Sequence, residues 1–336
     1  MVDIYLVTTG NVYFAQKKYP WQSMNVNCIK EKLEVEGYKV AVVSFSQLSC
    51  FLFDVKGKII IYTSSQVKEL KLYINDFAYF LKDNNMLIPS YESLLAHDNK
   101  GFQVLLNDKY GLNLIDSRYY PDLKDLCIKE KQLPFVLKTV DGASSHGVSL
   151  IKDKSDIARL MSWPKLFDNK SFALKAFLKK IIFRYKYDSD WELYRTYGNK
   201  RYIAQNFIDG LEGDYKVLVF GDKYYTLKRG IRAGDFKASG SGLHSRDFDD
   251  EIFLVLDQAK EFVSKYKSHL YSLDICISNG QAFLIEFQFT HVGPVTLTES
   301  NFFYRFENNK WKKISSVSNL EQEFVNSVVK YIGTVN

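Results

Sequence analysis

The sequence is poor in cysteine, and its thiols lie far apart along the chain. Cys28, Cys50, Cys127 and Cys276 form no Cys-x-x-Cys pair, and no histidine lies beside them at a zinc-binding spacing. This distribution argues against a structural zinc site, and we interpret all four residues as reduced thiols.

Long apolar runs, a one-sided charge balance and the common phosphate-binding motifs are also missing. No window approaches the roughly 18 apolar residues of a membrane span, and residues 1–10 lack the pattern of a signal peptide, so we expect a cytoplasmic protein. The 45 Lys and Arg against 39 Asp and Glu give a net charge of +6, which suits a nucleotide ligand but falls short of a nucleic-acid-binding signature. Neither a Walker motif nor Gly-x-Gly-x-x-Gly occurs.

The remaining composition is that of an ordinary globular protein. Of the 336 residues, 46% are hydrophobic and 25% charged, enough for a large core and two or three domains. Periodicity predicts strands over residues 3–8, 39–45 and 58–63 and helices over 24–36 and 67–82, which together make a small α/β domain. Ser23 is the expected N-cap of the first helix, and Gly37 stands where it should end.

The later segments follow a less regular order. A short strand is expected over residues 86–89, a helical stretch to Gly111, two β-rich runs over 133–151, and helical structure over 154–187 with a break at Trp163-Pro164. Mostly strand is expected from there until a terminal helix over 324–332. No internal repeat is visible.

Two carboxylates near the C-terminal end are the main candidate site. Asp274 and Glu286 lie in apolar runs on either side of Ser-Asn-Gly-Gln at 278–281, a turn sequence that predicts a two-stranded hairpin. Alternation along the second strand places Glu286, Gln288 and Thr290 on one face. Such a group of oxygens suits a hard cation held together with nucleotide phosphates, and the alternative is an exposed face of a two-sided hairpin.

A lysine and a loop of small residues form a second candidate site. Lys138 ends a predicted strand, and the loop that follows contains Gly142, Ser144, Ser145 and Gly147. Small residues let backbone N–H groups approach phosphate oxygens, and the ammonium group adds a mobile charge. The alternative is an ordinary hairpin loop.

A strand and a basic segment are the remaining candidate parts of a binding site. Residues 202–208 are an apolar strand followed by a polar connection, which is a reasonable adenine slot. Further on, Lys228, Arg229, Arg232 and Lys237 precede or enter a Gly/Ser-rich loop and would suit an anionic transition state. A solvated basic turn is the alternative.

In this order, the elements over residues 85–295 resemble the ATP-grasp superfamily of carboxylate-amine ligases. Asp214-Tyr-Lys216, the Lys-Arg pair and the segment around Lys237 are most similar to the branch of ribosomal-protein glutamate ligases, which has Asp-x-Arg, Lys-Arg and Phe-Arg-x-Asn. Lys216 and Lys237 depart from that pattern, as does Gln288, where Asn is usual.

The resemblance implies an α/β (α+β) fold, with ATP held between two α+β subdomains. It divides the chain into a small α/β domain at 1–85, a central subdomain at 86–200 and a C-terminal subdomain with the hinge strand and magnesium site at 201–336. The residues that it assigns to ATP are Lys100, Lys138, Gly142, Ser144, Ser145, Gly147, Gln205, Asn206, Phe207, Ile208, Asp214 and Lys228. Asp274, Glu286 and Gln288 match the ligands of magnesium, of which two ions are expected.

The implied reaction is a two-step ligation. A substrate carboxylate attacks ATP to give an acyl phosphate and ADP, and an amine then displaces phosphate, while Arg229, Arg232 and Lys237 stabilise the anionic intermediate. The expected substrates are small molecules, glycans or peptides, with a sugar acid or amino acid of surface-polysaccharide or peptide biosynthesis as our hypothesis by analogy. An ATP-binding module without catalysis and a ligase acting on peptides or proteins stay open as alternatives, and so does the oligomeric state, with a homodimer among the options.

The acceptor site is less defined. His291 and Thr296 follow the metal strand, and the loop at residues 8–14 would approach from the other side. The basic and aromatic stretch at 175–187 suits a polyanionic or lipid-linked acceptor, and its alternative is a solvated helix or strand face.

Overall fold

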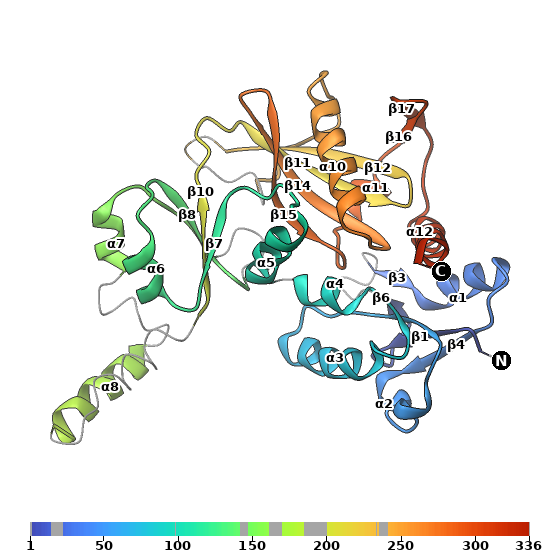
Figure 1. Cartoon of the computed structure of the whole chain (residues 1–336), viewed down its shortest axis with the longest axis horizontal. Helices are drawn as coiled ribbons and strands as arrows, with labels where there is room; N and C mark the ends of the chain where they lie inside the picture. The colour runs from blue at the N-terminus through green and yellow to red at the C-terminus, as the bar shows by residue number, and fades with distance from the viewer. Residues whose placement is uncertain are drawn as a thin grey trace. The chain divides into compact units, whose positions relative to one another are not determined.

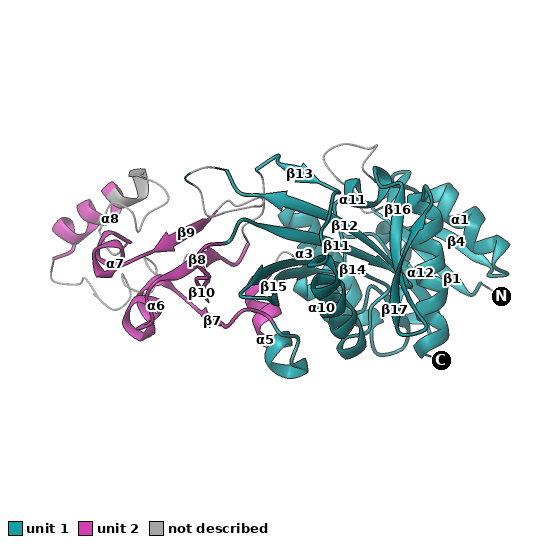
Figure 2. Ribbon diagram, turned by 90° about the horizontal axis from the view of Figure 1, so that it is seen from above, with its two compact units in different colours: residues 1–97, 106–113, 211–336 teal, residues 98–105, 114–210 magenta. Residues whose placement is uncertain are grey.

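A computed structural model describes residues 2–14, 23–97, 99–141, 147–160, 170–184, 200–232, 234 and 241–335 of the chain. The chain divides into two compact units (Figure 2). The first comprises residues 1–97, 106–113 and 211–336, and the second residues 98–105 and 114–210. Most residues of the predicted first and third domains thus belong to the same unit, and the division into three parts at 1–85, 86–200 and 201–336 stays a prediction.

The first unit begins with a four-stranded parallel sheet. Its strand order is β4 (Val40–Ser44), β1 (Ile4–Thr8), β5 (Ile59–Tyr62) and β6 (Met86–Ile88). Helix α1 (Val26–Val35) packs on one face through Ile29 and Leu33, and α3 (Lys68–Leu81) packs on the other through Ile74 and Ala78 (Figure 1). Each fully buried aliphatic side chain of this kind contributes roughly 1.5–3 kcal/mol. The predicted α/β organisation of the N-terminal segment is confirmed.

Helix α1 begins two residues later than the sequence suggests. Met24 and Asn25 form strand β3, which pairs with β2 (Tyr13–Phe14). The side chain of Asn25 accepts a hydrogen bond from the backbone N–H of Cys28, so Asn25 is the N-cap and the prediction of Ser23 was wrong. Gly37 follows the helix with φ of +92°, as its position predicted.

The rest of the first unit is built on a seven-stranded antiparallel sheet. The strand order is β15 (Gln281–Gln288), β14 (Leu270–Ser278), β11 (Gly213–Phe220), β12 (Lys223–Gly230), β16 (Phe302–Glu307) and β17 (Lys310–Ser315), with β13 (His244–Ser245) paired to β12. Helix α10 (Ile252–Lys265) covers one face where β14 and β15 lie, and Phe262 packs there against Phe287 and Phe289. This leaves the opposite face of these strands for polar side chains.

Helix α10 is absent from the sequence prediction, which expected mostly strands in this region. Its buried residues Ile252, Val255, Leu256, Ala259 and Phe262 have helical spacing, so the periodic signal was present. The terminal helix is α12 (Leu320–Val335), longer than the predicted 324–332, and it packs against α1 and β11. The shorter helical elements are α2 (Phe45–Leu48), η2 (Leu52–Asp54), α4 (Tyr91–Ala96) and α11 (Val295–Thr298).

The predicted hairpin between the two candidate carboxylates is confirmed. Strand β14 ends at Ser278, β15 begins at Gln281, and these two residues are paired. Asn279 and Gly280 form the turn with φ of +50° and +72°. Positive φ at both central residues is what a two-residue hairpin turn requires, and it explains the Asn-Gly sequence.

The second unit contains a four-stranded antiparallel sheet. The order is β7 (Ser117–Tyr120), β10 (Tyr202–Asn206), β8 (Phe135–Thr139) and β9 (Val148–Ile151). Helices α6 (Leu123–Lys129) and α7 (Lys154–Leu160) cover one face through a core that includes Leu126, Phe135 and Leu137. Helix α8 (Lys170–Ile182) also belongs to this unit, and α5 (Lys100–Tyr110) contributes its first half. The helical prediction for 154–187 is confirmed over α7 and α8, while Trp163, Pro164 and residues 185–187 lie outside the described residues.

Of the helices that the structure describes, none combines the length and the apolar character needed to cross a membrane.

One buried histidine makes the first unit sensitive to acid. His269 precedes β14 and its ring packs edge-on against Phe324, with centroids 5.8 Å apart. Burial lowers the pKa of His269 from 6.5 to about 3, so the folded protein keeps the ring neutral while the unfolded chain protonates it below pH 6.5. Stability is therefore lost as the pH falls from about 7 towards 3.

We predict that His269→Gln reduces this acid sensitivity. Between pH 7 and pH 5 the free energy of unfolding should fall by about 2 kcal/mol less in the variant than in the parent chain. Urea unfolding at both pH values measures this difference, and His244→Gln, at an exposed position, is the matched control. Equal pH slopes for the parent chain and His269→Gln would contradict the assignment.

Candidate active site

Three charged side chains form a row across neighbouring strands of the first unit. Glu286 of β15 is paired with Asp274 of β14, which is paired with Lys216 of β11. Directly paired residues of antiparallel strands share a face, so all three side chains lie opposite the face that α10 covers. The structure thus brings together the two carboxylates that the sequence singled out.

A β-bulge keeps this row in place. The pairing shifts between Asp274 and Ile275, because Ile275 is paired with Leu284 and Ile285 is left as an extra residue on β15. Leu284 is therefore fully buried while Glu286 stays on the polar face. Sequence alternation predicted the faces of Glu286 and Gln288 correctly, but it contained no signal for the bulge.

A buried arginine joins Asp274 to a second aspartate. Arg229 Nε donates to Asp214 Oδ1 at 2.6 Å, and its Nη2 lies 2.8 Å from both Asp214 Oδ2 and Asp274 Oδ2. Asp214 and Arg229 are cross-strand neighbours on β11 and β12. One guanidinium group therefore serves two carboxylates, a geometry that a lysine cannot reproduce.

The charges in this cluster set the protonation states. Burial by itself would raise the pKa of Asp274, but Arg229 and Lys216 outweigh it and lower the pKa to about 2. Burial raises the pKa of Asp214 to about 6, helped by the negative charge of Asp274 and opposed by Arg229. The two carboxylates raise the pKa of Arg229 despite its burial, so it stays charged. Asp274 is consequently an ionised carboxylate at neutral pH.

One oxygen of that carboxylate is available for a further interaction. Among the described residues, Asp274 Oδ1 is buried without a hydrogen-bond partner, and Lys216 Nζ lies 3.6 Å away while donating to Ser272 Oγ at 2.8 Å. Gln288 is paired with Ser272 and so adjoins the same spot. Counting Asp214, Asp274 and Glu286 against Lys216 and Arg229 gives 3 − 2 = 1 excess negative charge. This donor set fits a hard cation such as magnesium.

The protein alone offers few ligands for such a cation. No group of three or more His, Cys, Asp or Glu side chains is placed to hold a metal anywhere in the described part of the chain. Two carboxylates and an amide oxygen are too few for an octahedral ion, so the remaining ligands must come from phosphates or water. The row therefore suits a metal that arrives with a nucleotide.

A cavity lies beyond the end of β15, where Thr290 and His291 form part of its wall. Its polar lining includes Tyr62, Ser64, Thr290 and His291, and its apolar lining includes Phe14, Met24, Phe220, Leu270 and Phe324. Tyr62 and Thr290 are buried, and their hydroxyl groups have no hydrogen-bond partner among the described residues. Burial also raises the pKa of Tyr62 well above its ordinary value, so the phenol stays neutral. The cavity is thus walled by uncharged polar and apolar groups.

Of the two residues proposed for the acceptor, His291 lines this cavity and Thr296 does not. His291 has φ of +49° and stacks on His97, with ring centroids 4.9 Å apart. Thr296 is buried in α11. The contact with His97 was not predicted, because a histidine nearly 200 residues away carries no local signal of pairing.

The predicted phosphate lysines both lie in the second unit. Lys138 is on β8, between Ile203 of β10 and Val148 of β9, on the face opposite the helix-covered core. Lys100 begins α5, and its backbone N–H donates to the carbonyl of Val140 at 3.3 Å. The first turn of α5 is therefore tied to the chain just beyond Lys138.

The small-residue loop is described only at its edges. Gly142, Ser144 and Ser145 lie outside the described residues, whereas Gly147 has φ of +73° and its carbonyl accepts from the N–H of Thr139 at 2.9 Å. A Cβ at Gly147 would clash with Thr139 Oγ1, so both conformation and space favour glycine here.

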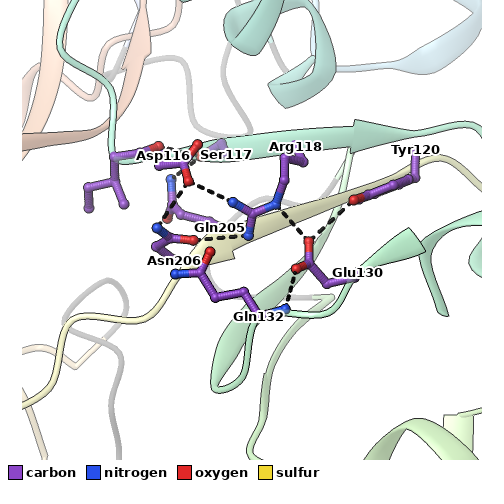
Figure 3. A network of polar contacts seen from close by, with 9 residues as sticks. Asp116, Ser117, Arg118, Tyr120, Glu130, Gln132, Gln205 and Asn206 are labelled. Atoms are coloured by element: carbon purple, nitrogen blue, oxygen red, sulfur yellow. Dashed lines mark hydrogen bonds and ion pairs between the residues drawn. The ribbon is translucent and has the colours of Figure 1, made fainter. Parts of the chain in front are cut away.

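The predicted adenine strand is bound into a polar network of its own unit (Figure 3). Asn206 Oδ1 accepts from Arg118 at 2.9 Å, and Asn206 Nδ2 donates to Asp116 at 3.1 Å. Arg118 in turn donates to buried Glu130 at 2.7 Å, and Gln205 donates to Ser117 at 3.1 Å. Phe207 and Ile208 follow the strand and are half-buried. The side chains of Gln205 and Asn206 thus position β10 against β7, a role that the sequence did not suggest.

The remaining basic residues of the predicted site that the structure describes are not gathered around Asp274. Lys228 neighbours Arg229 in sequence but lies over the ring of Tyr215, 5.4 Å from its centroid, on the other face of the sheet. Arg232 Nε donates to the carbonyl of Ser241 at 2.8 Å, so it joins the two ends of the basic loop. Lys237 lies outside the described residues.

Comparisons of sequence find no relative. No protein-family model matches the chain, and no curated protein matches it.

Solved structures do match. D-cycloserine synthetase DcsG is similar with a TM-score of 0.51 and 14% identity, covering 97% of this chain and 99% of its own. The ADP complex of the N5-carboxyaminoimidazole ribonucleotide synthetase purK has a TM-score of 0.53 and 13% identity, covering 90% and 74%. The N5-carboxyaminoimidazole synthetase from Staphylococcus aureus complexed with ADP has a TM-score of 0.50 and 8% identity, covering 98% and 77%. The chain therefore has the ATP-grasp fold.

Proposed function

We propose that the protein is an ATP-dependent ligase that joins a carboxylate to an amine through an acyl phosphate and releases ADP and phosphate. The observation that carries the proposal is the paired position of Asp274 and Glu286, with a buried Asp274 oxygen that no described residue hydrogen-bonds. Similar structures that hold ADP support a nucleotide as the ligand of the fold. Two paired carboxylates that could hold a metal together with a nucleotide speak against a module that only binds ATP.

Asp274, Glu286 and Gln288 would hold magnesium. When bound, magnesium supplies charge neutralisation for the phosphate oxygens in the transfer step. Arg229 keeps Asp274 ionised and fixes its direction, and Asp214 fixes Arg229 in turn. Lys100, Lys138 and the small-residue loop are proposed for the phosphates of ATP and β10 for its base, and all of them belong to the second unit.

The chemistry needs positioning more than covalent help from side chains. In the first step a substrate carboxylate oxygen attacks the γ-phosphorus, the bond to the β-phosphate oxygen breaks, and ADP leaves. In the second step the amine nitrogen attacks the acyl carbon, the carbon–oxygen bond to phosphate breaks, and the nitrogen loses a proton. We propose that Lys216, and Arg232 at the loop ends, balance the negative charge on the transferring group and on the tetrahedral intermediate, because the charge of Arg229 is already shared by Asp214 and Asp274.

We propose that the cavity beside Thr290, with a volume of about 40 Å³, receives a small group of one substrate and not the whole molecule. Its uncharged hydroxyl and imidazole groups and apolar walls favour a molecule with an apolar part and neutral hydrogen-bonding groups near the reacting centre. An assay of ADP and phosphate release against pooled carboxylates and amines tests the proposed activity. Release of ADP and phosphate that depends on both pools supports ligation. Absence of release across a broad pool, while the protein still binds ADP, would favour a module that only binds the nucleotide. A mass shift of a peptide or protein in the same assay would identify a peptide-modifying ligase.

We predict that Asp274→Asn with Glu286→Gln abolishes substrate-dependent ADP release. Loss of both carboxylates removes the charged metal ligands, and a decrease of at least about a thousandfold is expected. Asp250→Asn with Glu251→Gln makes the same chemical changes at exposed positions and should keep parental activity. Full activity in the Asp274/Glu286 variant would show that the metal site is wrongly assigned.

A second prediction concerns Gln288. Gln288→Ala removes the amide oxygen proposed as a metal ligand, so it should raise the magnesium concentration for half-maximal ADP release by about tenfold to a hundredfold. The effect should be smaller than that of losing both carboxylates, because an amide is a weaker ligand than a carboxylate. The maximal rate at saturating magnesium should change less, and Gln288→Asn should restore part of the affinity. A magnesium titration that is identical for the parent chain and Gln288→Ala would remove Gln288 from the site.

The cavity gives a third prediction. Tyr62→Phe removes a buried hydroxyl without a described partner, so the free energy of unfolding should stay the same or rise by about 1 kcal/mol. The KM for the substrate that occupies the cavity should increase by about tenfold, since that substrate loses a hydrogen bond. Unchanged KM values for both substrates, measured at equal stability, would exclude the cavity as a substrate site.

A further inference from the structure

Helix α8 is a segment whose composition the proposed ligase activity does not use. Over residues 170–184 the chain carries five cations and no acid: Lys170, Lys175, Lys179, Lys180 and Arg184. The charge of this segment is therefore +5 in a chain whose net charge is +6. Such a concentration of positive charge within about four helical turns indicates an anionic partner.

The same helix exposes its apolar side chains. Leu174, Leu178, Ile181 and Ile182 follow the spacing i, i+4, i+7, i+8, and their exposed fractions range from 46% to 70%. Phe177 and Phe183 are exposed as well. At about 100° per residue, the four aliphatic residues occupy one side of the helix, and Lys175 and Lys179 border that side. Figure 1 shows α8 standing apart from the β7–β10 sheet of its own unit.

Helix α3 provides an internal comparison. It also exposes large apolar side chains, among them Leu72 and Phe80, but it carries the acids Glu69 and Asp76 among its lysines. Exposed apolar residues therefore occur elsewhere on this chain, but only α8, among the described helices of ten or more residues, combines them with cations alone.

We propose that α8 docks on the surface of an anionic lipid membrane. A helix that carries Leu and Ile on one side and lysines beside them lies in the plane of the interface, with its apolar side among the acyl chains and its ammonium groups at the phosphates. A second copy of the chain is a poor occupant, because two such helices would bring ten cations together. An acidic protein would pair with the five cations, but such pairing would not explain why four aliphatic side chains are exposed beside them. The inference does not depend on the ligase activity.

The test is sedimentation of the full chain with vesicles. The parent chain should bind vesicles containing phosphatidylglycerol in phosphatidylcholine, and bind pure phosphatidylcholine vesicles at least tenfold more weakly. Lys175→Gln with Lys179→Gln should weaken binding to the anionic vesicles by about 30-fold. Leu178→Ser with Ile181→Ser should weaken it by at least about tenfold even though no charge changes.

Matched variants and a second ligand make the result decisive. Lys56→Gln with Lys68→Gln removes the same charge from exposed positions of the first unit and should keep full vesicle binding. Circular dichroism and ADP binding confirm that each variant is folded. Absence of sedimentation with anionic vesicles overturns the proposal, and so does salt-sensitive binding to an acidic polypeptide such as polyglutamate without vesicle binding. Vesicle binding that the Leu178/Ile181 variant retains in full would also overturn it, because the attraction would then be charge alone.

Discussion

The guanidinium group of Arg229 is the contact on which the polar face of the first unit depends. It holds Asp214 through two hydrogen bonds and pairs with Asp274 at 2.8 Å. Without it, two buried carboxylates would face each other across β11 and β14, and breaking a buried pair in this way costs roughly 3–5 kcal/mol. Because Arg229 neutralises both, Asp274 can stay ionised inside the sheet and keep an oxygen for a cation. The Glu286–Asp274–Lys216 row thus depends on a residue of a fourth strand, β12.

Local signals in the sequence were sufficient for several parts of this site. The turn at Asn279-Gly280 and the alternation around Glu286 predicted the β14–β15 hairpin and its polar face, because both depend on residues close in sequence. The small α/β domain of the N-terminal segment was predicted from alternating strands and helices for the same reason, and the structure adds that its sheet is parallel. The ATP-grasp fold itself came from the order of motifs, and the similar solved structures agree with it at 8–14% identity.

Contacts between distant segments were beyond such signals. Lys228 and Arg229 are adjacent in sequence, but distant segments separate their roles: Lys228 lies over Tyr215, whereas Arg229 pairs with Asp274 of β14. Asn206 was expected at a base, yet its side chain is held by Asp116 and Arg118, about 90 residues earlier. The bulge at Ile285 and the stacking of His97 on His291 likewise arise from tertiary packing. Each of these alters which groups are available for chemistry.

We propose that the Glu286–Asp274 face holds a metal only together with a nucleotide. Electron paramagnetic resonance of Mn²⁺, a substitute for Mg²⁺, measures this directly as loss of the free-ion signal. We expect little binding of Mn²⁺ to the chain alone, because Arg229 and Lys216 offset the carboxylates, and binding of Mn²⁺ when ADP is added. Tight binding without ADP, or none beyond that of Mn²⁺ to free ADP when both are present, would contradict it.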